Sequence, residues 1–164
     1  GDRLHFGEVE VEVLNPSSVI EPGRPDNERS VVLEARLGGR SIVLAGDAGA
    51  ATEAELTTLA GRADLLKVGH HGSRSSSTGA FLATIHPKVA AISCGRNNRF
   101  GHPHPEVVGR LRALGARICR TDQDGAFSVE LLAKPAPATR LDEACALAAR
   151  RPAIRTPPET VDAE

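Results

Sequence analysis

An alternation of short apolar segments with helix-forming ones runs through the middle of this 164-residue sequence and restricts its fold more than any other feature. Each apolar segment has the length of a strand and is followed by glycine or polar residues, while the segments between them are rich in helix formers. Strands are expected at 64–68, 89–93, 116–120 and 126–132, and helices at 49–60, 78–85 and 104–114. Strands that alternate with helices predict an α/β fold rather than a helical bundle or a β-sandwich.

Antiparallel strands are expected before this alternation begins. Valines at 9, 11 and 13 alternate with glutamates, which predicts a half-buried strand. Two further strands at 30–37 and 40–45 meet at a pair of glycines suited to a tight hairpin turn. The sequence begins at Gly1 within strand-like residues, so we expect it to be a piece of a longer polypeptide.

The organised pattern covers residues 1–133, and 134–164 reads as a separate tail. Proline, alanine and arginine dominate the tail, where 141–150 could form one short helix and the remainder has nothing to bury. No apolar run approaches the roughly 18 residues that cross a bilayer, so we expect no direct membrane insertion by this segment.

The composition limits the kinds of partner. A net charge of -1 gives no general attraction to nucleic acid, so any attraction to a phosphate polymer has to be local. Aromatic residues make up only 2% of the chain, which disfavours a site built on aromatic stacking, including the platforms that hold single-stranded bases.

The first candidate for chemistry is Asp47, which follows the buried strand at 40–45. The strand would hold the carboxylate rigidly and Gly46 would let the chain bend into a cleft, as a metal ligand requires. The alternative is that Asp47 only caps the helix at 49–60, because aspartate is among the best N-cap residues.

Two adjacent histidines, His70 and His71, follow the next strand between glycines. Burying two imidazoles side by side as packing residues would need several hydrogen bonds, whereas imidazole is a common zinc ligand and proton carrier. Successive side chains on an extended segment point to opposite sides, so we expect one histidine to bind metal and the other to orient water or substrate.

Two polar loops could bind phosphate. Ser73 and Arg74 lie in a serine-rich segment whose backbone N–H groups could approach an anion, although such segments are commonly flexible surface loops. The loop at 95–104 contributes Arg96, Asn98 and Arg99. It also contains His102 before a proline, a candidate proton donor, and His104, which could merely cap the next helix.

These motifs together resemble a known family. The order Leu44-Ala45-Gly46-Asp47, Leu66-Lys67-Val68-Gly69-His70-His71-Gly72-Ser73 and Asn98-Arg99-Phe100-Gly101-His102-Pro103, preceded by Asn27 and Ser30-Val31-Val32-Leu33, is similar to the metallo-β-lactamase-fold domain of ComEC-type competence proteins. Pro87-Lys88-Val89 with Ile92-Ser93, and the closing Thr121-Asp122 with Gly125-Ala126-Phe127, extend the resemblance over residues 1–132.

The resemblance implies a four-layered αββα sandwich, of which this chain would form the C-terminal portion. It also implies a site for two divalent metal ions, zinc or manganese, in which Asp47 matches the bridging aspartate and His70 a late histidine ligand. His71 and His102 match positions near the site and are expected to act in catalysis. The implied partners are DNA and the upstream part of the same polypeptide, including a membrane-spanning channel.

One departure from the family stands out. The principal metal motif of the fold, His-x-His-x-Asp-His, is missing, since the segment at 102–107 has only its first spacing. We expect upstream residues to supply it, and the chain alone to be inactive; a degenerate relative is the alternative. The lead hypothesis is a DNA phosphodiesterase at the extracellular or periplasmic side of the cell membrane. The alternatives are a cytoplasmic hydrolase of a small ester, lactone or phosphodiester, and a non-catalytic structural or DNA-guiding module.

Overall fold

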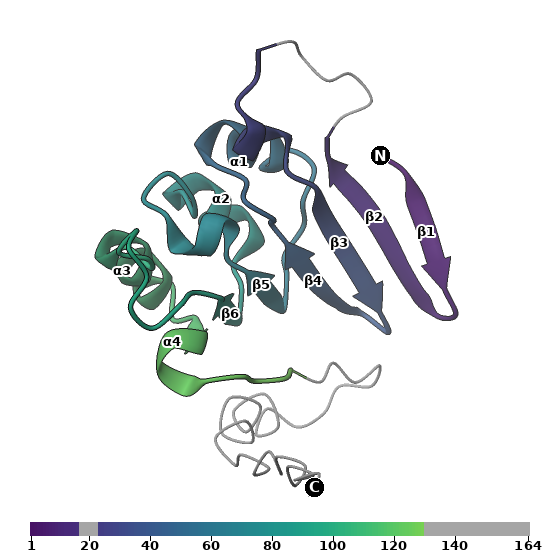
Figure 1. Cartoon of the computed structure of the whole chain (residues 1–164). Helices are drawn as coiled ribbons and strands as arrows, with labels where there is room; N and C mark the ends of the chain where they lie inside the picture. The colour runs from purple at the N-terminus through teal and green to yellow at the C-terminus, as the bar shows by residue number, and fades with distance from the viewer. Residues whose placement is uncertain (17–22, 130–164) are drawn as a thin grey trace, which may run out of the picture.

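A computed structural model describes residues 1–16 and 23–129, in which a seven-stranded sheet carries helices on one side (Figure 1). The strands are β1 (Arg3–Phe6), β2 (Val9–Asn15), β3 (Val32–Leu37), β4 (Arg40–Leu44), β5 (Leu65–Lys67), β6 (Val89–Ile92) and β7 (Arg117–Arg120). The helices are α1 (Ala50–Leu56), α2 (Gly79–Ile85), α3 (Pro105–Ala113) and α4 (Thr121–Asp124), with 3-10 turns η1 (Asp26–Arg29) and η2 (Gly69–Gly72). Spatial order follows chain order, antiparallel from β1 to β4 and parallel from β4 to β7. The expected α/β class is confirmed.

The main disagreement between the strands expected from the sequence and those in the structure lies near the C-terminal end of the described residues. The expected strand at 126–132 is wrong over 126–129, which form no strand. The chain enters α4 directly after β7, where the carboxylates of Asp122 and Asp124 both accept hydrogen bonds from Arg120. Phe127 and Val129 then pack in irregular backbone against Leu65, Val89 and Cys119, so their apolar alternation reflects packing on the sheet and not pairing with it. The remaining residues of that strand, the possible helix at 141–150 and the tail at 134–164 lie outside the described residues.

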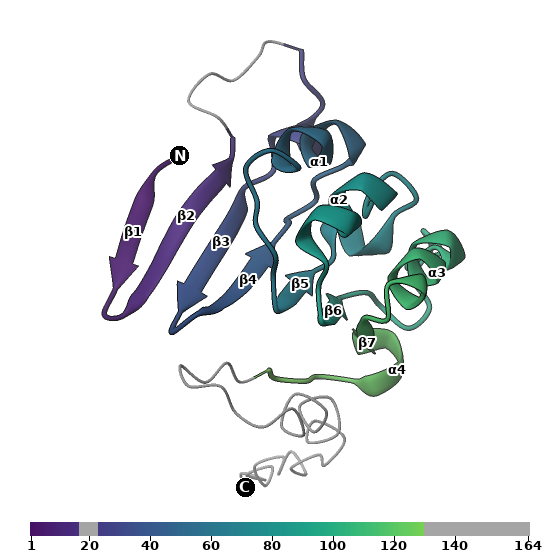
Figure 2. The ribbon, with the colours of Figure 1, turned by 180° about the vertical axis from the view of Figure 1, so that it is seen from behind.

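The hydrophobic core lies between the sheet and helices α1, α2 and α3. Leu56, Phe81 and Leu111 from the helices form one buried cluster with strand residues that include Val43 and Leu66. Views from the front and from behind agree that the three helices lie together near the parallel strands, with the β1–β2 hairpin beyond them (Figures 1 and 2). None of the described helices is long and apolar enough to cross a membrane.

The face of the sheet away from these helices is apolar across β1 to β4. The strand register places ten apolar side chains on it: Leu4, Phe6, Val9, Val11, Val13, Leu33, Ala35, Leu37, Ile42 and Leu44. Phe6 is 65% exposed and Leu4 is 48% exposed. Large continuous apolar surfaces of this kind favour contact with another surface.

We expect the 164-residue chain to self-associate through this apolar face. Replacing Leu4 and Phe6 together by lysine should weaken the association at least about tenfold, because each exposed side chain that becomes buried contributes roughly 1.5–3 kcal/mol. Sedimentation velocity over a concentration series measures the change. His5→Lys, on the same strand but the opposite face, is the matched control and should associate as the wild-type chain does. A wild-type chain that stays monomeric throughout would contradict the prediction.

The helix side of the same antiparallel strands is charged instead. Glu34 is only 1% exposed and accepts hydrogen bonds of 3.0 and 2.7 Å from Arg36, which also binds Glu12 at 3.2 Å. Burial raises the pKa of Glu34, while the Arg36 guanidinium acts in the opposite direction. The hairpin region therefore has one polar and one apolar face, as antiparallel sheets commonly do.

Asp64, directly before β5, connects the starts of three parallel strands. Its carboxylate accepts hydrogen bonds from Arg40 (3.2 Å), the Ser41 backbone N–H (3.1 Å) and Lys88 (2.7 Å). Burial raises the pKa of Asp64, but the hydrogen bonds from Lys88 and Ser41 outweigh burial and hold that pKa below its usual value.

Asp64→Asn is expected to lower the free energy of unfolding by about 2 kcal/mol at pH 7, since hydrogen bonds to a charged group are lost. A depressed pKa means that the ionised carboxylate stabilises the fold above the ordinary value near 3.8, and that this stabilisation disappears as the pH falls through the lower folded-state pKa. The difference between variant and wild type should therefore shrink below about pH 4. Urea unfolding at several pH values measures it, with the exposed Asp2→Asn as control. A difference that does not change with pH would refute the ionic explanation.

Candidate functional site

The carboxyl ends of β4, β5 and β6 meet at one edge of the sheet, because these strands are parallel. Asp47 follows β4, His70 and His71 lie in η2 after β5, and His102 lies in the loop after β6. The structure therefore brings the four residues expected at the metal and catalytic positions to the same edge. We define them as the histidine-aspartate cluster.

Asp47 and His71 form the closest polar pair of the cluster. Asp47 Oδ1 lies 3.5 Å from His71 Nε2, and His71 Nδ1 lies 2.7 Å from the carbonyl oxygen of Ser93. Because a carbonyl oxygen can only accept, Nδ1 carries a proton. The lone pair of a neutral His71 would then face a carboxylate oxygen, so the arrangement suits a proton or another cation between Nε2 and Oδ1.

Asp47 does not cap α1, so that alternative is wrong. The N-cap residue is Gly49 and no side chain caps from that position. Glu28 of η1 fills this role, since its carboxylate accepts from the Thr52 backbone N–H at 2.8 Å and from the Thr52 hydroxyl at 2.6 Å. A Cβ on Gly49 would lie 2.5 Å from Glu28 Oε1, so a larger residue there would displace this carboxylate. The Asp47 carboxylate is left to face His71.

The histidine pair is not extended, contrary to the expectation from the sequence. His70 and His71 both occupy the left-handed region, with φ of 45° and 54°. Contacts from the loop after β4 impose this bend: the Gly46 carbonyl accepts from the His70 N–H at 3.1 Å, and a Cβ on Gly69 would lie 2.8 Å from the Ala48 carbonyl oxygen. Positive φ at two consecutive non-glycine residues stores strain that the surroundings have to sustain, a feature that concentrates at functional sites.

His70 has partners different from those of His71. Its Nδ1 lies 3.4 Å from Asn27 Nδ2, and its ring lies edge-on to that of His102 with centroids 5.8 Å apart. Asn27 belongs to η1, which Glu28 ties to α1 through Thr52. Sequence reasoning placed Asn27 in a motif but gave it no role, because only the folded chain brings η1 beside η2.

His102 is held by Asn98. The Asn98 amide donates to the carbonyl oxygens of Gly95 (2.8 Å) and His102 (2.7 Å), and its oxygen accepts from the His102 N–H at 2.9 Å. The Asn98 side chain, a candidate phosphate ligand, is thus engaged within its own loop. Burial lowers the pKa of His102, and the charges of the neighbouring histidines lower it further, which favours the neutral ring. Its Nδ1 is buried without a hydrogen-bond partner among the described residues.

The other candidate phosphate-binding side chains differ in how far they are engaged. Arg74 donates to Nε2 of His104 at 2.8 Å and lies 3.6 Å from Glu106, so His104 makes no capping bond to α3. The Arg96 Nε donates to a backbone carbonyl of α4 at 3.2 Å. The Ser73 hydroxyl lies 3.3 Å from that of Ser75. Arg99 alone among these candidates has no polar partner within the described residues, and its guanidinium lies 4.9 Å from the centre of the Phe100 ring.

Glu53 is a site residue that the sequence did not reveal. It is fully buried, and its two carboxylate oxygens accept from the backbone N–H groups of Ser77 (2.5 Å) and Thr78 (2.7 Å). Burial raises the pKa of Glu53, although both N–H groups and the Arg110 charge oppose the change. The serine-rich segment is consequently anchored at its end, where it enters α2, and its interpretation as a flexible surface loop is wrong at Ser76 and Ser77, which are fully buried.

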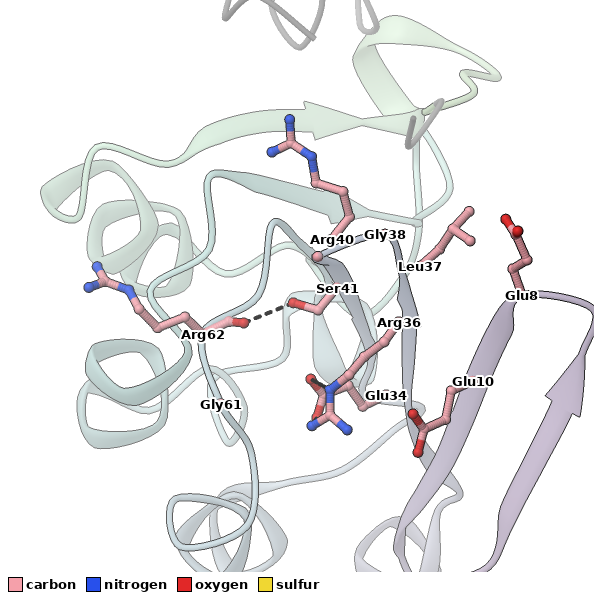
Figure 3. Close-up of a pocket in the computed structure, with 11 residues that line it drawn as sticks. Glu8, Glu10, Glu34, Arg36, Leu37, Gly38, Arg40, Ser41, Gly61 and Arg62 are labelled. Atoms are coloured by element: carbon pink, nitrogen blue, oxygen red, sulfur yellow. Dashed lines mark hydrogen bonds and ion pairs between the residues drawn. The ribbon is translucent and has the colours of Figure 1, made fainter. Parts of the chain in front are cut away.

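A cavity of about 410 Å³ lies at the opposite end of the strands, beside the β3–β4 turn. Arg36 and Glu34 point toward each other in it, and the Ser41 hydroxyl donates to the Arg62 carbonyl oxygen at 2.8 Å (Figure 3). Arg40 at its rim is paired with Asp64. This cavity is remote from the histidine-aspartate cluster, and its described ion pairs already satisfy Arg36 and Arg40.

Asp47 and His70 have the donor chemistry that zinc or manganese requires, but their number is insufficient. Within residues 1–16 and 23–129, no group of three or more histidine, cysteine, aspartate or glutamate side chains is arranged to hold a metal ion. The described residues therefore do not make a metal site by themselves.

Comparison with known proteins places the chain beside competence-related proteins. No family model matches it. It is 40% identical over 127 residues to ComE operon protein 3 of Bacillus subtilis, 35% identical over 129 residues to Recombination protein 2 of Haemophilus influenzae, and 36% identical over 132 residues to Competence protein ComA of Neisseria gonorrhoeae. These matches cover 76–79% of the chain but only 16–19% of each relative. The chain is thus similar over most of its length to a short segment of proteins whose names denote competence and recombination.

Proposed function

We propose that this chain is part of a metal-dependent hydrolase domain of a ComEC-like DNA-uptake protein that cleaves phosphodiester bonds. The observation that carries the proposal is the meeting of Asp47, His71, His70 and His102 at the carboxyl edge of three parallel strands. The names of the similar proteins support a role in competence, which makes DNA the first substrate to test.

The cluster suits acid-base work on a phosphate ester. Neutral His102 can accept a proton, and its burial beside His70 keeps it near the reacting group. Ser93 orients the His71 ring, and Asp47 lies 3.5 Å from its Nε2, where it would be the counter-charge for a proton taken up there during the reaction. Arg99, free of any described ion pair, can hold a neighbouring phosphate and supplies the local positive charge that the net charge of the chain does not.

Two zinc or manganese ions belong to the proposal, with Asp47 and His70 as this chain's ligands. Residues outside the chain would complete the set, because the described donors are too few. Bound there, the ions would withdraw negative charge from the phosphoryl group. The test is titration of zinc and manganese into the longer polypeptide: Asp47→Ala and His70→Ala should each weaken binding, and unchanged affinity would refute these ligand assignments.

The four-layer αββα sandwich is likewise proposed. The apolar face of β1 to β4 would be covered by a second sheet from the upstream part of the polypeptide, and the complete domain would lie on the extracellular or periplasmic side of the membrane. The exposed Leu4 and Phe6 support this arrangement, since they leave apolar surface for such a layer.

The decisive experiment supplies the longer polypeptide with labelled single-stranded DNA, a small phosphodiester, a carboxylic ester and a lactone, each with zinc or manganese. Cleavage of DNA that stops on chelation is the expected result. Turnover of the small substrates without DNA cleavage would instead indicate a hydrolase of a small ester or phosphodiester. No turnover of any substrate would leave a structural or DNA-guiding module.

A further inference from the structure

Phe100 exposes an aromatic ring beside the histidine-aspartate cluster. The chain has four phenylalanines, and Phe100 is 65% exposed although it lies in the well-braced loop between β6 and α3. Water contact with a ring of this size is unfavourable, and the hydrogen bonds of Asn98 hold the following turn in place. The exposure therefore belongs to a defined loop conformation.

The ring is physically connected to the cluster. Phe100 and His102 are stacked, with centroids 5.8 Å apart and planes inclined by 18°, and the His102 ring lies 5.8 Å from that of His70. A planar group stacked on Phe100 would be separated from His70 by the rings of Phe100 and His102. A base in that position would belong to a nucleotide close to the phosphate at the cluster.

The charge around Phe100 favours a polyanion. The segment from 95 to 104 contains two arginines and two histidines and no acidic residue. The Arg99 guanidinium, which lies over the phenyl ring, is a planar cation that can stack on a base or bind its phosphate. Proteins hold single-stranded nucleic acid with exposed aromatic side chains that stack on the bases and with cationic side chains that bind the backbone phosphates.

We propose that Phe100 and Arg99 form a stacking subsite for one unpaired base of a single-stranded nucleic acid. The subsite rests on the proposed function for its substrate class and adds that the base is unpaired, because stacking on a base inside a duplex would first require that base step to be unstacked. The low aromatic content excludes an extended platform, but one ring is enough to hold one base. A docking site for an apolar protein segment fits less well, since the Arg99 guanidinium lies over the ring.

The absence of tryptophan and tyrosine from the chain permits a direct test. Phe100→Trp introduces a single tryptophan whose fluorescence a stacked base quenches. The probes are a thymidine dodecamer, an abasic dodecamer with the same phosphates, and a duplex of the same length. Phe6 is a matched control, because it is also 65% exposed but lies on β1.

Quenching of the tryptophan at 100 by the thymidine strand, with little by the abasic strand or the duplex and none at a tryptophan at 6, is the expected result. Phe100→Leu should weaken binding of the thymidine strand by roughly 5- to 100-fold and leave abasic binding unchanged, whereas Phe6→Leu should bind both as wild type does. Equal quenching by both strands, or wild-type affinity of Phe100→Leu, would overturn the proposal and leave Phe100 as a contact for another molecule.

These measurements involve no hydrolysis, so the two proposals can fail separately. Base-dependent quenching in the 164-residue chain, together with no DNA cleavage by the longer polypeptide, would preserve the stacking subsite and remove the proposed activity. DNA cleavage by the longer polypeptide, together with binding that does not depend on the base, would preserve the proposed activity and remove the stacking subsite.

Discussion

Asp47→Ala is expected to slow DNA cleavage by the longer polypeptide by about 100-fold or more, the scale of losing an acid-base partner. The carboxylate lies 3.5 Å from His71 Nε2, and Ser93 fixes the ring so that this nitrogen faces Asp47. Without Asp47, positive charge on His71 loses its nearest counter-charge. Initial rates on labelled single-stranded DNA under saturating metal measure the loss.

A double variant separates a shared role from two independent ones. If Asp47 and His71 act as a unit, the Asp47→Ala/His71→Ala variant should be no slower than the slower single variant, because groups that work together are not additive. Asp26→Ala, an exposed aspartate whose side chain is 90% exposed, is the control and should cleave normally. A double variant whose rate reduction equals the product of the two single reductions would refute the coupling. A normal rate for Asp47→Ala would remove Asp47 from the mechanism.

Glu53→Ala is expected to lower the free energy of unfolding by about 3 kcal/mol, since it leaves two buried N–H groups without acceptors. Those N–H groups, of Ser77 and Thr78, begin α2 just after the histidine loop. Glu53→Gln keeps the shape and one acceptor oxygen, so it should lose less. Urea unfolding followed by circular dichroism measures both variants.

Glu55 provides the control on the same helix. Its side chain is 53% exposed and, among the described residues, pairs with Arg24, so Glu55→Ala should change stability by less than about 0.5 kcal/mol. Equal effects of the alanine substitutions at 53 and 55 would show that the buried hydrogen bonds do not stabilise the fold.

Much of the fold could be predicted because local pattern and tertiary structure agree. The segments at 64–68 and 89–93 are short, apolar and bounded by turns, and both form parallel strands inside the sheet, β5 and β6. Parallel neighbours then bring the residues after them to one edge, so the meeting of Asp47 with the histidines could be anticipated. The prediction failed at 126–129 because Phe127 and Val129 pack against Leu65, Val89 and Cys119 without forming a strand, a difference that apolar alternation alone does not reveal.

The geometry within the site could not be predicted, because distant contacts determine it. The left-handed bend at His70 depends on carbonyl groups that follow β4, and the surroundings of that ring depend on Asn27 in η1. Glu53 has the sequence context of an ordinary surface helix, yet the fold buries it completely. The low aromatic content disfavoured any stacking site in the sequence analysis. The proposed role of Phe100 depends instead on the position of one exposed ring beside the histidine-aspartate cluster.

The apolar face of the sheet also has a mechanical consequence. It continues from the hairpin strands into Ile42 and Leu44 of β4, the strand that ends just before Asp47. A second layer packed on this face would contact both the β1–β2 hairpin and β4, the strand that leads to Asp47. Packing of such a layer would therefore restrict the motion of Asp47 through β4, without contacting any residue of the histidine-aspartate cluster.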